Sequence, residues 1–268
     1  GRRVVILGSG DIGLIMARRM TLEGAKVLAC VEVMPYSGGL TRNIVQCLND
    51  FDIPLYLSHT VSDIQGRDRV ERVVVSEVGP DRRPIPGTEM TFDCDTVLLS
   101  VGLIPENELS RGADIQMDPR TNGPVVYENM ETSIPGVFAC GNVLHVHDLV
   151  DFVTAEAARA GRAAAAYCAG KQTAEGRTLD IRNGSLVGYT VPQHVRMDAD
   201  FTGADVFFRV RAICGVSRIA VRDESGAQIA SFRREHMAPG EMENIRLPRV
   251  LLEKAQGAVT VSVEEEQA

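Results

Sequence analysis

Three glycines near the start of the chain, followed by one acidic residue, have the spacing of a dinucleotide-binding loop. Gly8, Gly10 and Gly13 form a G-x-G-x-x-G run, and Glu32 stands 19 residues after the last of them. Glycines at these places allow a tight turn, a close approach of the backbone to a pyrophosphate, and close packing of a helix on a strand. A carboxylate about 20 residues further on accepts hydrogen bonds from the ribose hydroxyls of an adenosine and repels a 2′-phosphate. The pattern therefore predicts binding of NAD(H) in preference to NADP(H).

The segments around these glycines have the patterns that such a loop requires. Residues 4–7 are an apolar run typical of a strand, and the apolar residues after Gly13 recur at helical spacing. A second strand is expected over 26–33, with Glu32 near its end. Free N–H groups and the dipole at the start of the helix favour phosphates. The alternative is that the glycines are turn residues of an α/β fold without a ligand, and that Glu32 is a solvated strand end.

Further residues are predicted to contact the nucleotide. Ser9, Asp11 and Ile12 lie within the glycine run, and Gly102 ends a later apolar strand. Arg42, just beyond the second strand, is predicted either to touch an adenosine phosphate or to be a surface residue of a helix. No catalytic side chain is identified, because hydride transfer between cofactors requires none.

Composition and charge exclude several classes of function. The chain has 268 residues and a net charge of −8, which argues against nucleic acid or an anionic membrane as a partner. No apolar run reaches the roughly 18 residues of a membrane span, and no signal peptide opens the chain, so we expect a soluble, cytoplasmic protein. None of the six cysteines forms a C-x-x-C, and most are expected to be small core residues. Hydrolysis is not supported, because neither a Ser-His-Asp set nor a pair of catalytic carboxylates is apparent.

The chain continues the alternation of strands and helices after Glu32. The elements expected are a helix over 41–49, a strand over 53–57, strands at 70–78 and 90–92 in an antiparallel meander of about three strands, and a buried parallel strand over 96–101. The meander should lie over the parallel sheet. A short strand over 124–127 and a helix over 149–168 are expected next. That helix is crowded with small residues, which let a helix pack closely against a backbone or a ligand.

The last part of the chain is expected to be nearly all β. A boundary is placed at 170–177, and short alternating strands with turn signals follow. They suggest a sandwich of the immunoglobulin-like type. Its expected role is a docking surface, and the charged residues 264–266 are expected to form a solvated end.

Three motifs together resemble the pyridine-nucleotide-disulfide oxidoreductase flavoproteins. They are residues 8–13 with Glu32, residues 100–107, and residues 132–142. The motifs occur in the order and spacing of that family and cover roughly residues 1–168, and the 132–142 motif is the most specific of them.

The resemblance implies an arrangement of domains. In that family a nucleotide domain is inserted between two halves of an FAD domain. Residues 1–113 would then be a Rossmann-like NAD(H)-binding domain, residues 114–176 the second half of the FAD domain, and residues 177–268 the β-sandwich. The first FAD half, with its own glycine fingerprint, is not found in the sequence. We therefore expect that the chain, which begins abruptly before its first strand, is part of something longer.

The resemblance also implies site residues. The Gly-Asp pair that holds a flavin ribityl hydroxyl falls on Gly141 and Asn142, and the amide oxygen of asparagine can still accept a hydrogen bond. The start of the 149–168 helix would point at the flavin and stabilise negative charge on the reduced ring. Many relatives have tyrosine and glutamate where Asp11 and Ile15 stand here, so the usual position of the nicotinamide is not implied for this chain.

The run His145-Val146-His147-Asp148 lies between the flavin motif and the helix. Three roles are open for it: metal binding, contact with the flavin loop or a substrate, and capping of the helix by Asp148. Without further ligands in the sequence, no metal site is predicted.

These observations favour an FAD-dependent NAD(P)H oxidoreductase that transfers a hydride between NADH and flavin and then to an acceptor of unidentified class. The expected partners are a nicotinamide nucleotide, FAD and a redox partner subunit, and we expect an oligomer. Two alternatives stay open. One is a nucleotide-binding subunit of a larger dehydrogenase that docks through its β-sandwich, and the other is a non-catalytic NAD-responsive module.

Overall fold

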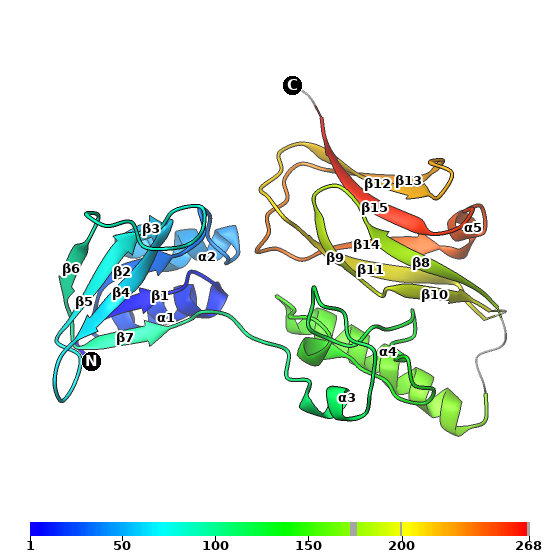
Figure 1. Ribbon diagram of the computed structural model, residues 1–268, viewed down its shortest axis with the longest axis horizontal. Helices are drawn as coiled ribbons and strands as arrows, with labels where there is room; N and C mark the ends of the chain where they lie inside the picture. Colours follow the sequence, from blue (N-terminus) through cyan, green and yellow to red (C-terminus); the bar gives the residue numbers. More distant parts are fainter. Residues whose placement is uncertain (172–175, 199, 267–268) are drawn as a thin grey trace. The chain divides into compact units, whose positions relative to one another are not determined.

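The computed structural model describes residues 1–171, 176–198 and 200–266. It consists of two compact units, Gly1–Gly102 and Leu103–Ala268 (Figure 1). None of the helices in the described part of the chain is long and apolar enough to cross a membrane. The domain boundaries expected from the sequence remain a prediction.

The first unit is built on a parallel sheet. Its strands are β1 (Arg3–Leu7), β2 (Lys26–Glu32), β3 (Leu55–Leu57) and β7 (Thr96–Leu99), in the order β3-β2-β1-β7. Each neighbouring pair is parallel. Helix α1 (Asp11–Leu22) connects β1 to β2, as the apolar spacing after Gly13 predicts. The carboxyl ends of all four strands therefore lie at the same edge of the sheet, where the glycine loop begins.

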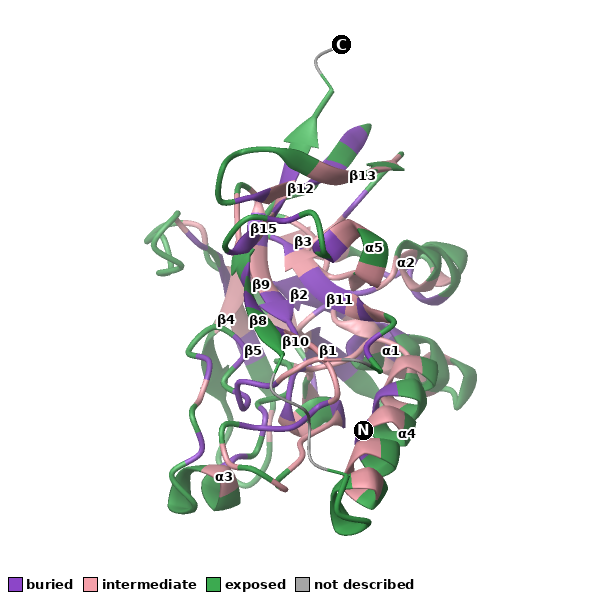
Figure 2. Cartoon of the chain, turned by 90° about the vertical axis from the view of Figure 1, so that its right-hand side faces the viewer, coloured by how far each residue is buried: buried purple, intermediate pink, exposed green. Residues whose placement is uncertain are grey.

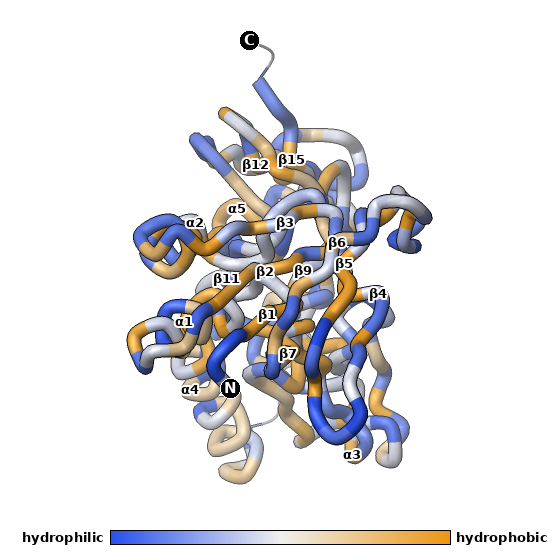
Figure 3. Tube along the Cα trace, turned by 90° about the vertical axis from the view of Figure 1, so that its left-hand side faces the viewer, coloured by the Kyte–Doolittle hydropathy of each residue, from blue (hydrophilic) through white to orange (hydrophobic). Residues whose placement is uncertain are grey.

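Both faces of this sheet are covered, one by helices and the other by an antiparallel meander. Alternate residues of β1 point to opposite faces, so Val4 and Ile6 join the core beneath the helices, whereas Val5 joins the core beneath the meander. The covering elements are α2 (Thr41–Cys47) and the 3-10 helix η1 (Asn49–Phe51) beside α1, and β4 (His59–Gln65), β5 (Arg72–Glu77) and β6 (Met90–Asp93) on the opposite face. Figure 3 shows the hydrophobic character of β2 and β5. The predicted meander over a parallel sheet is confirmed.

The prediction of a buried strand over 96–101 is wrong in one respect. The strand is present and parallel to β1, but it ends at Leu99, and the side chains of Leu99 and Val101 are 65% and 70% exposed. The physical reason is the position of β7 at the edge of the sheet, where only one neighbouring strand covers it. Apolar composition alone does not distinguish an edge strand from a central one.

The second unit starts with a largely irregular segment and one long helix. Its elements are α3 (Glu108–Gly112), the 3-10 helix η2 (Gly141–Val143) and α4 (Val150–Cys168). The predicted strand over 124–127 is wrong, because these residues make only isolated bridges, from Pro124 to Met117 and from Tyr127 to His194. The segment is held to the rest of the unit by a small core that includes Val126, Met130, Leu144 and Val191.

Helix α4 starts and ends where its sequence predicts, but it is packed differently from the expectation. Of its residues only Glu156 and Ala160 are buried, and most of the helix is exposed or intermediate (Figure 2). Ala155, Ala157 and Gly161 are exposed. The small residues are therefore not packed closely against a neighbouring backbone within the described chain.

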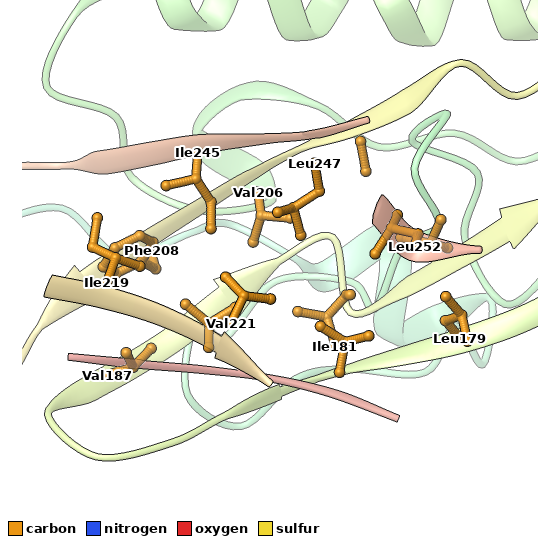
Figure 4. Close-up of a cluster of buried hydrophobic side chains, with 14 of the residues drawn as sticks. Leu179, Ile181, Val187, Val206, Phe208, Ile219, Val221, Ile245, Leu247 and Leu252 are labelled. Carbon is orange, nitrogen blue, oxygen red and sulfur yellow. The ribbon is translucent and has the colours of Figure 1, made fainter. Parts of the chain in front are cut away.

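The rest of the unit is a sandwich of two sheets. Its elements are β8 (Arg177–Asn183), β9 (Val187–Val191), β10 (His194–Met197), β11 (Gly203–Val210), β12 (Ser217–Asp223), β13 (Gln228–Arg234), β14 (Glu243–Pro248), the short helix α5 (Arg249–Leu252) and β15 (Val259–Glu265). The sheets have the orders β10-β8-β15-β12-β13 and β14-β11-β9. Figure 4 shows how Val206 and Ile245 of one sheet meet Ile181 and Val221 of the other in a common core.

The immunoglobulin-like type of this sandwich remains a prediction. Its strands β15 and β8 pair in parallel, whereas the other pairs in the two sheets are antiparallel. The boundary predicted at 170–177 falls partly on residues 172–175, which lie outside the described residues.

Residues 264–266 are exposed to solvent, as expected, but they do not form a loose tail. Glu264 belongs to β15 and forms an ion pair with Arg222 of β12, and Glu266 pairs with Arg218. The strand continues further than its apolar alternation indicates, because cross-strand arginines compensate the acidic side chains.

Candidate functional site

The turn after β1 requires glycine at its first position. Gly8 has a φ of +102°, and a Cβ atom there would lie 1.9 Å from the carbonyl oxygen of Ser100. Any side chain would therefore collide with the backbone that follows β7. A Cβ at Gly13 would lie 2.4 Å from the Gly8 carbonyl oxygen, so helix α1 also needs a glycine to pack against the turn.

The second glycine has a different environment. Gly10 is the N-cap of α1, and this helix start has no side-chain cap hydrogen bond. The φ of Gly10 is −66°, a value that any residue type can adopt. A Cβ at Gly10 would meet nothing within 4 Å. Neither backbone conformation nor packing within the protein explains this glycine. The uncapped start of α1 and the open space beside Gly10 fit an anionic group that approaches the backbone from outside.

The carboxylate of Glu32 is joined to the glycine loop. Its Oε2 accepts hydrogen bonds from the backbone N–H of Ser9 at 2.9 Å and from the Ser9 hydroxyl at 2.7 Å. Its Oε1 accepts one from the N–H of Met34 at 2.9 Å. Glu32 is 8% exposed and Ser9 is fully buried. Because each carboxylate oxygen has two lone pairs, Oε1 keeps one free acceptor position.

A cavity of about 410 Å³ lies at this edge of the sheet. Its lining residues come from the ends of β1, β2 and β7, from the loops near them and from the start of β4: Leu7, Gly8, Gly10, Glu32, Val33, Gly38, Thr60, Ser100, Val101 and Gly102. The structure thus brings together four of the predicted residues, Gly8, Gly10, Glu32 and Gly102. Sequence analysis missed Gly38 and Thr60, although the turn-rich composition of residues 34–39 was a signal for the first of these.

Other predicted contacts do not line the cavity. The Asp11 carboxylate accepts hydrogen bonds from the N–H of Leu40 at 2.8 Å and from the Asn43 side chain at 2.7 Å, so it holds the start of α2. Ile12 is 66% exposed. Arg42 lies exposed on α2, which agrees with the alternative of a surface helix residue. The part of Ser9 in the site is indirect, through Glu32.

The flavin-type motif lies in the second unit. Gly141 has a φ of +74°, and its N–H donates to the Glu156 carboxylate. The Asn142 side-chain oxygen accepts a hydrogen bond from the N–H of His147 at 3.1 Å. A cavity of about 470 Å³ lies beside the motif and is lined by residues that include Glu106, Ala139, Cys140 and Val143.

Asp148 does not cap the helix that follows it, so that alternative is wrong. Helix α4 has Leu149 as its N-cap and no side-chain cap hydrogen bond. Asp148 instead forms an ion pair with Arg209 of the sandwich and accepts a hydrogen bond from the N–H of Met242. Burial by itself lowers the pKa of Arg209, but its interactions with Tyr189 and Asp148 outweigh burial and raise that pKa. Asp148 therefore joins the flavin-type loop to the sandwich.

The two histidines of the same run converge on a residue that the sequence analysis did not identify. Nε2 of His145 lies 3.0 Å from one carboxylate oxygen of Glu156, and Nε2 of His147 lies 3.1 Å from the other. All three side chains are about 1% exposed. Glu156 was missed because it lies inside α4, where an acidic residue is ordinary; its position opposite the histidines depends on how α4 packs.

Four of the six cysteines are buried, as predicted: Cys30, Cys47, Cys94 and Cys214. Burial, followed by the nearby charge of Glu32, raises the pKa of Cys30 to about 12. Cys168 is exposed at the end of α4, and all six thiols are free.

Comparisons with known proteins agree on one protein family. The family model of pyridine nucleotide-disulphide oxidoreductases matches residues 1–172. An NADH oxidase of Streptococcus pneumoniae (strain ATCC BAA-255 / R6) is 30% identical over 185 residues, which are 66% of this chain and 37% of that protein. A mitochondrial dihydrolipoyl dehydrogenase of Caenorhabditis elegans is 29% identical over 150 residues, which are 53% of this chain and 29% of that protein. The chain thus spans about a third of the length of these curated relatives.

A solved structure agrees with this result. The thioredoxin reductase of T. acidophilum has a TM-score of 0.55 and 28% sequence identity to this chain. The similarity covers 63% of this chain and 53% of that one.

Proposed function

Because the chain belongs to the pyridine nucleotide-disulphide oxidoreductases, a family that uses FAD and NAD(P)H, we propose that it binds NADH for hydride transfer to or from an FAD. The observation that carries this proposal is the Glu32 carboxylate, held by Ser9 at the mouth of the glycine-loop cavity. The name of the Streptococcus pneumoniae relative, an NADH oxidase, supports the choice of nucleotide.

The glycine loop would bind the pyrophosphate. The uncapped N-terminus of α1 supplies N–H groups and the positive end of a helix dipole, and the open space at Gly10 admits a phosphate close to the backbone. The cavity of about 410 Å³ begins at this loop and extends to Gly102. These features fit an extended anionic nucleotide better than a neutral ligand.

Glu32 would select the unphosphorylated adenosine. One lone pair of its Oε1 is free to accept a hydrogen bond from a ribose hydroxyl, and the other positions are used by Ser9 and Met34. A 2′-phosphate at the same place would bring two anions together in a site where the carboxylate is only 8% exposed. We therefore expect NADH to bind more tightly than NADPH.

Residues of the 139–143 segment would form part of an FAD site. The Asn142 side chain keeps one acceptor lone pair and two donors beyond its bond to His147. The uncapped start of α4 offers further N–H groups. When bound, FAD would supply the group that accepts or releases the hydride, and the protein would supply its position and electrostatic surroundings.

Calorimetric titration of the 268-residue chain with NADH and with NADPH tests the proposal. The expected result is saturable binding of NADH with an affinity at least about tenfold above that of NADPH. Equal affinities would remove Glu32 as the selective group, and no binding of either nucleotide would refute the proposal. Turnover that appears only after a partner protein is added would favour the alternative of a nucleotide-binding subunit.

A further inference from the structure

Three buried side chains beside the flavin-type motif form a cluster that the proposed hydride transfer does not use. His145 and His147 lie in the loop before α4, and Glu156 lies in the second turn of that helix. The carboxylate connects the two imidazoles, with oxygen to Nε2 distances of 3.0 and 3.1 Å, and one ligand atom from each residue lies within 4.8 Å of the others. The two histidines and Glu156 come together because α4 packs against the segment that precedes it.

The cluster consists of side chains that commonly bind metal ions. Imidazole nitrogen and carboxylate oxygen are typical ligands of transition-metal ions, which bind histidine in its neutral form and glutamate in its ionised form.

The charge of the cluster also points to a cation. Glu156 is about 1% exposed, and its ion pairs among the described residues are with the two histidines alone. The nearby Arg209 is already paired with Asp148. An ionised carboxylate is costly in the interior, and a dication at the same place would compensate its charge.

The distances suit coordination of a single ion. Zinc binds histidine nitrogen and carboxylate oxygen at roughly 2.0–2.2 Å, so neighbouring ligands in a tetrahedral site lie roughly 3.3 Å apart. The observed separations of 3.0 and 3.1 Å differ from this by a few tenths of an ångström. Coordination at Nε2 would place each imidazole proton on Nδ1, and both Nδ1 atoms are buried without a hydrogen-bond partner in the described residues. The metal–ligand bonds would therefore have to offset the cost of two unsatisfied N–H groups.

We propose that His145, His147 and Glu156 bind one transition-metal dication of the Zn²⁺ class, a site that goes beyond the proposed binding of NADH and FAD. Two imidazole ligands favour such an ion over Mg²⁺ or Ca²⁺, which prefer oxygen ligands. Three protein ligands leave at least one coordination position for water or another small ligand.

The test uses Co²⁺ as a spectroscopic probe of the tag-free chain after treatment with a chelator. We expect one equivalent of Co²⁺ to produce visible d–d absorption, which one equivalent of Zn²⁺ then abolishes. Glu156→Gln keeps a side-chain oxygen for the Gly141 N–H but removes the anionic ligand. This variant and His147→Ala should each weaken Co²⁺ binding by at least about 100-fold, since even loss of a supporting group around a metal costs 10- to 100-fold.

His194→Ala is the matched control, because the His194 ring also contacts a carboxylate, that of Asp180, outside the cluster. Its Co²⁺ binding should equal that of the unaltered chain. Absence of a stoichiometric band, Glu156→Gln binding as tightly as the unaltered chain, or an equal loss in His194→Ala would each overturn the proposal. Far-UV circular dichroism of each variant confirms that it is folded. NADH affinity is measured in a separate titration of the unaltered chain. Failure of the metal site therefore leaves the nucleotide proposal unaffected.

Discussion

Replacement of Glu32 by glutamine is the most direct test of nucleotide selection. In the structure one oxygen of this carboxylate holds Ser9 through two hydrogen bonds, and the other accepts one bond from Met34 and keeps a free position. The glutamine oxygen can replace the acceptor for Ser9. Its amide group then takes the place of the oxygen that accepts from the Met34 N–H and would face the ribose. The variant therefore loses the charged acceptor and the bond to Met34, while the two hydrogen bonds from Ser9 are kept.

The expected loss follows from the kind of bond removed. A hydrogen bond to a charged group contributes about 1.5–3 kcal/mol, which corresponds to roughly 10- to 150-fold weaker NADH binding. NADPH should bind as well as before or better, because the repulsion of its 2′-phosphate disappears. Glu32→Ala is a less selective test, since it leaves the buried N–H and hydroxyl of Ser9 without their acceptor at a cost of about 1–3 kcal/mol for each group.

Isothermal titration calorimetry with both nucleotides measures the effect, and thermal unfolding checks that the fold is retained. Glu23→Gln is the matched control, because Glu23 is an exposed glutamate paired with Arg19 just after α1. It should change neither affinity. Unchanged NADH affinity in Glu32→Gln, or an equal loss for NADH and NADPH, would refute the assignment of Glu32 as the ribose acceptor.

Three further predictions concern other parts of the molecule. Gly10→Ala should keep the melting temperature but weaken NADH binding at least about tenfold, because its Cβ enters open space where the pyrophosphate approaches. Labelling of the native chain at pH 8 with a thiol reagent should modify the exposed Cys168, whereas Cys30, with a pKa of about 12, should react only after unfolding. Asp148→Ala removes the carboxylate partner of the largely buried Arg209, which keeps hydrogen bonds to backbone carbonyl oxygens, and should lower the free energy of unfolding in urea by about 3 kcal/mol.

Each of these predictions has a contrary outcome. Full NADH affinity in Gly10→Ala would mean that the open space beside the loop is not where the phosphates bind. Modification of Cys30 at the rate of Cys168 in the folded chain would contradict its burial beneath the glycine loop. An unfolding free energy within 1 kcal/mol of the unaltered chain in Asp148→Ala would show that the Arg209 pair contributes little, as exposed pairs do.

The sequence determined the parts of this protein that depend on neighbouring residues. The β1-α1-β2 unit, the meander and helix α4 follow from apolar periodicity and turn residues, which act over a few positions. The same holds for Gly8, whose turn conformation admits only glycine, and for Glu32, which a strand of regular length brings to the loop. These features can be predicted from the sequence because the interactions that determine them are local.

Tertiary structure alone decided which distant side chains meet. The partner of Asp148 is Arg209, 61 residues away in the sandwich, and no spacing rule joins two such positions. The same lack of a local signal applies to the exposed edge strand β7 and to Glu264, whose arginine partner is on another strand.

The His145–His147–Glu156 cluster shows the difference most clearly. The histidines were visible in the sequence as a short motif, but their third member was not, because it lies 9 and 11 residues further on in a helix whose direction local sequence does not fix. Packing of α4 under the loop brings the carboxylate between the two rings. Structure that depends on residues close in the sequence can therefore be predicted from local propensity. Contacts between separate elements depend instead on the balance of burial and charge over the whole unit.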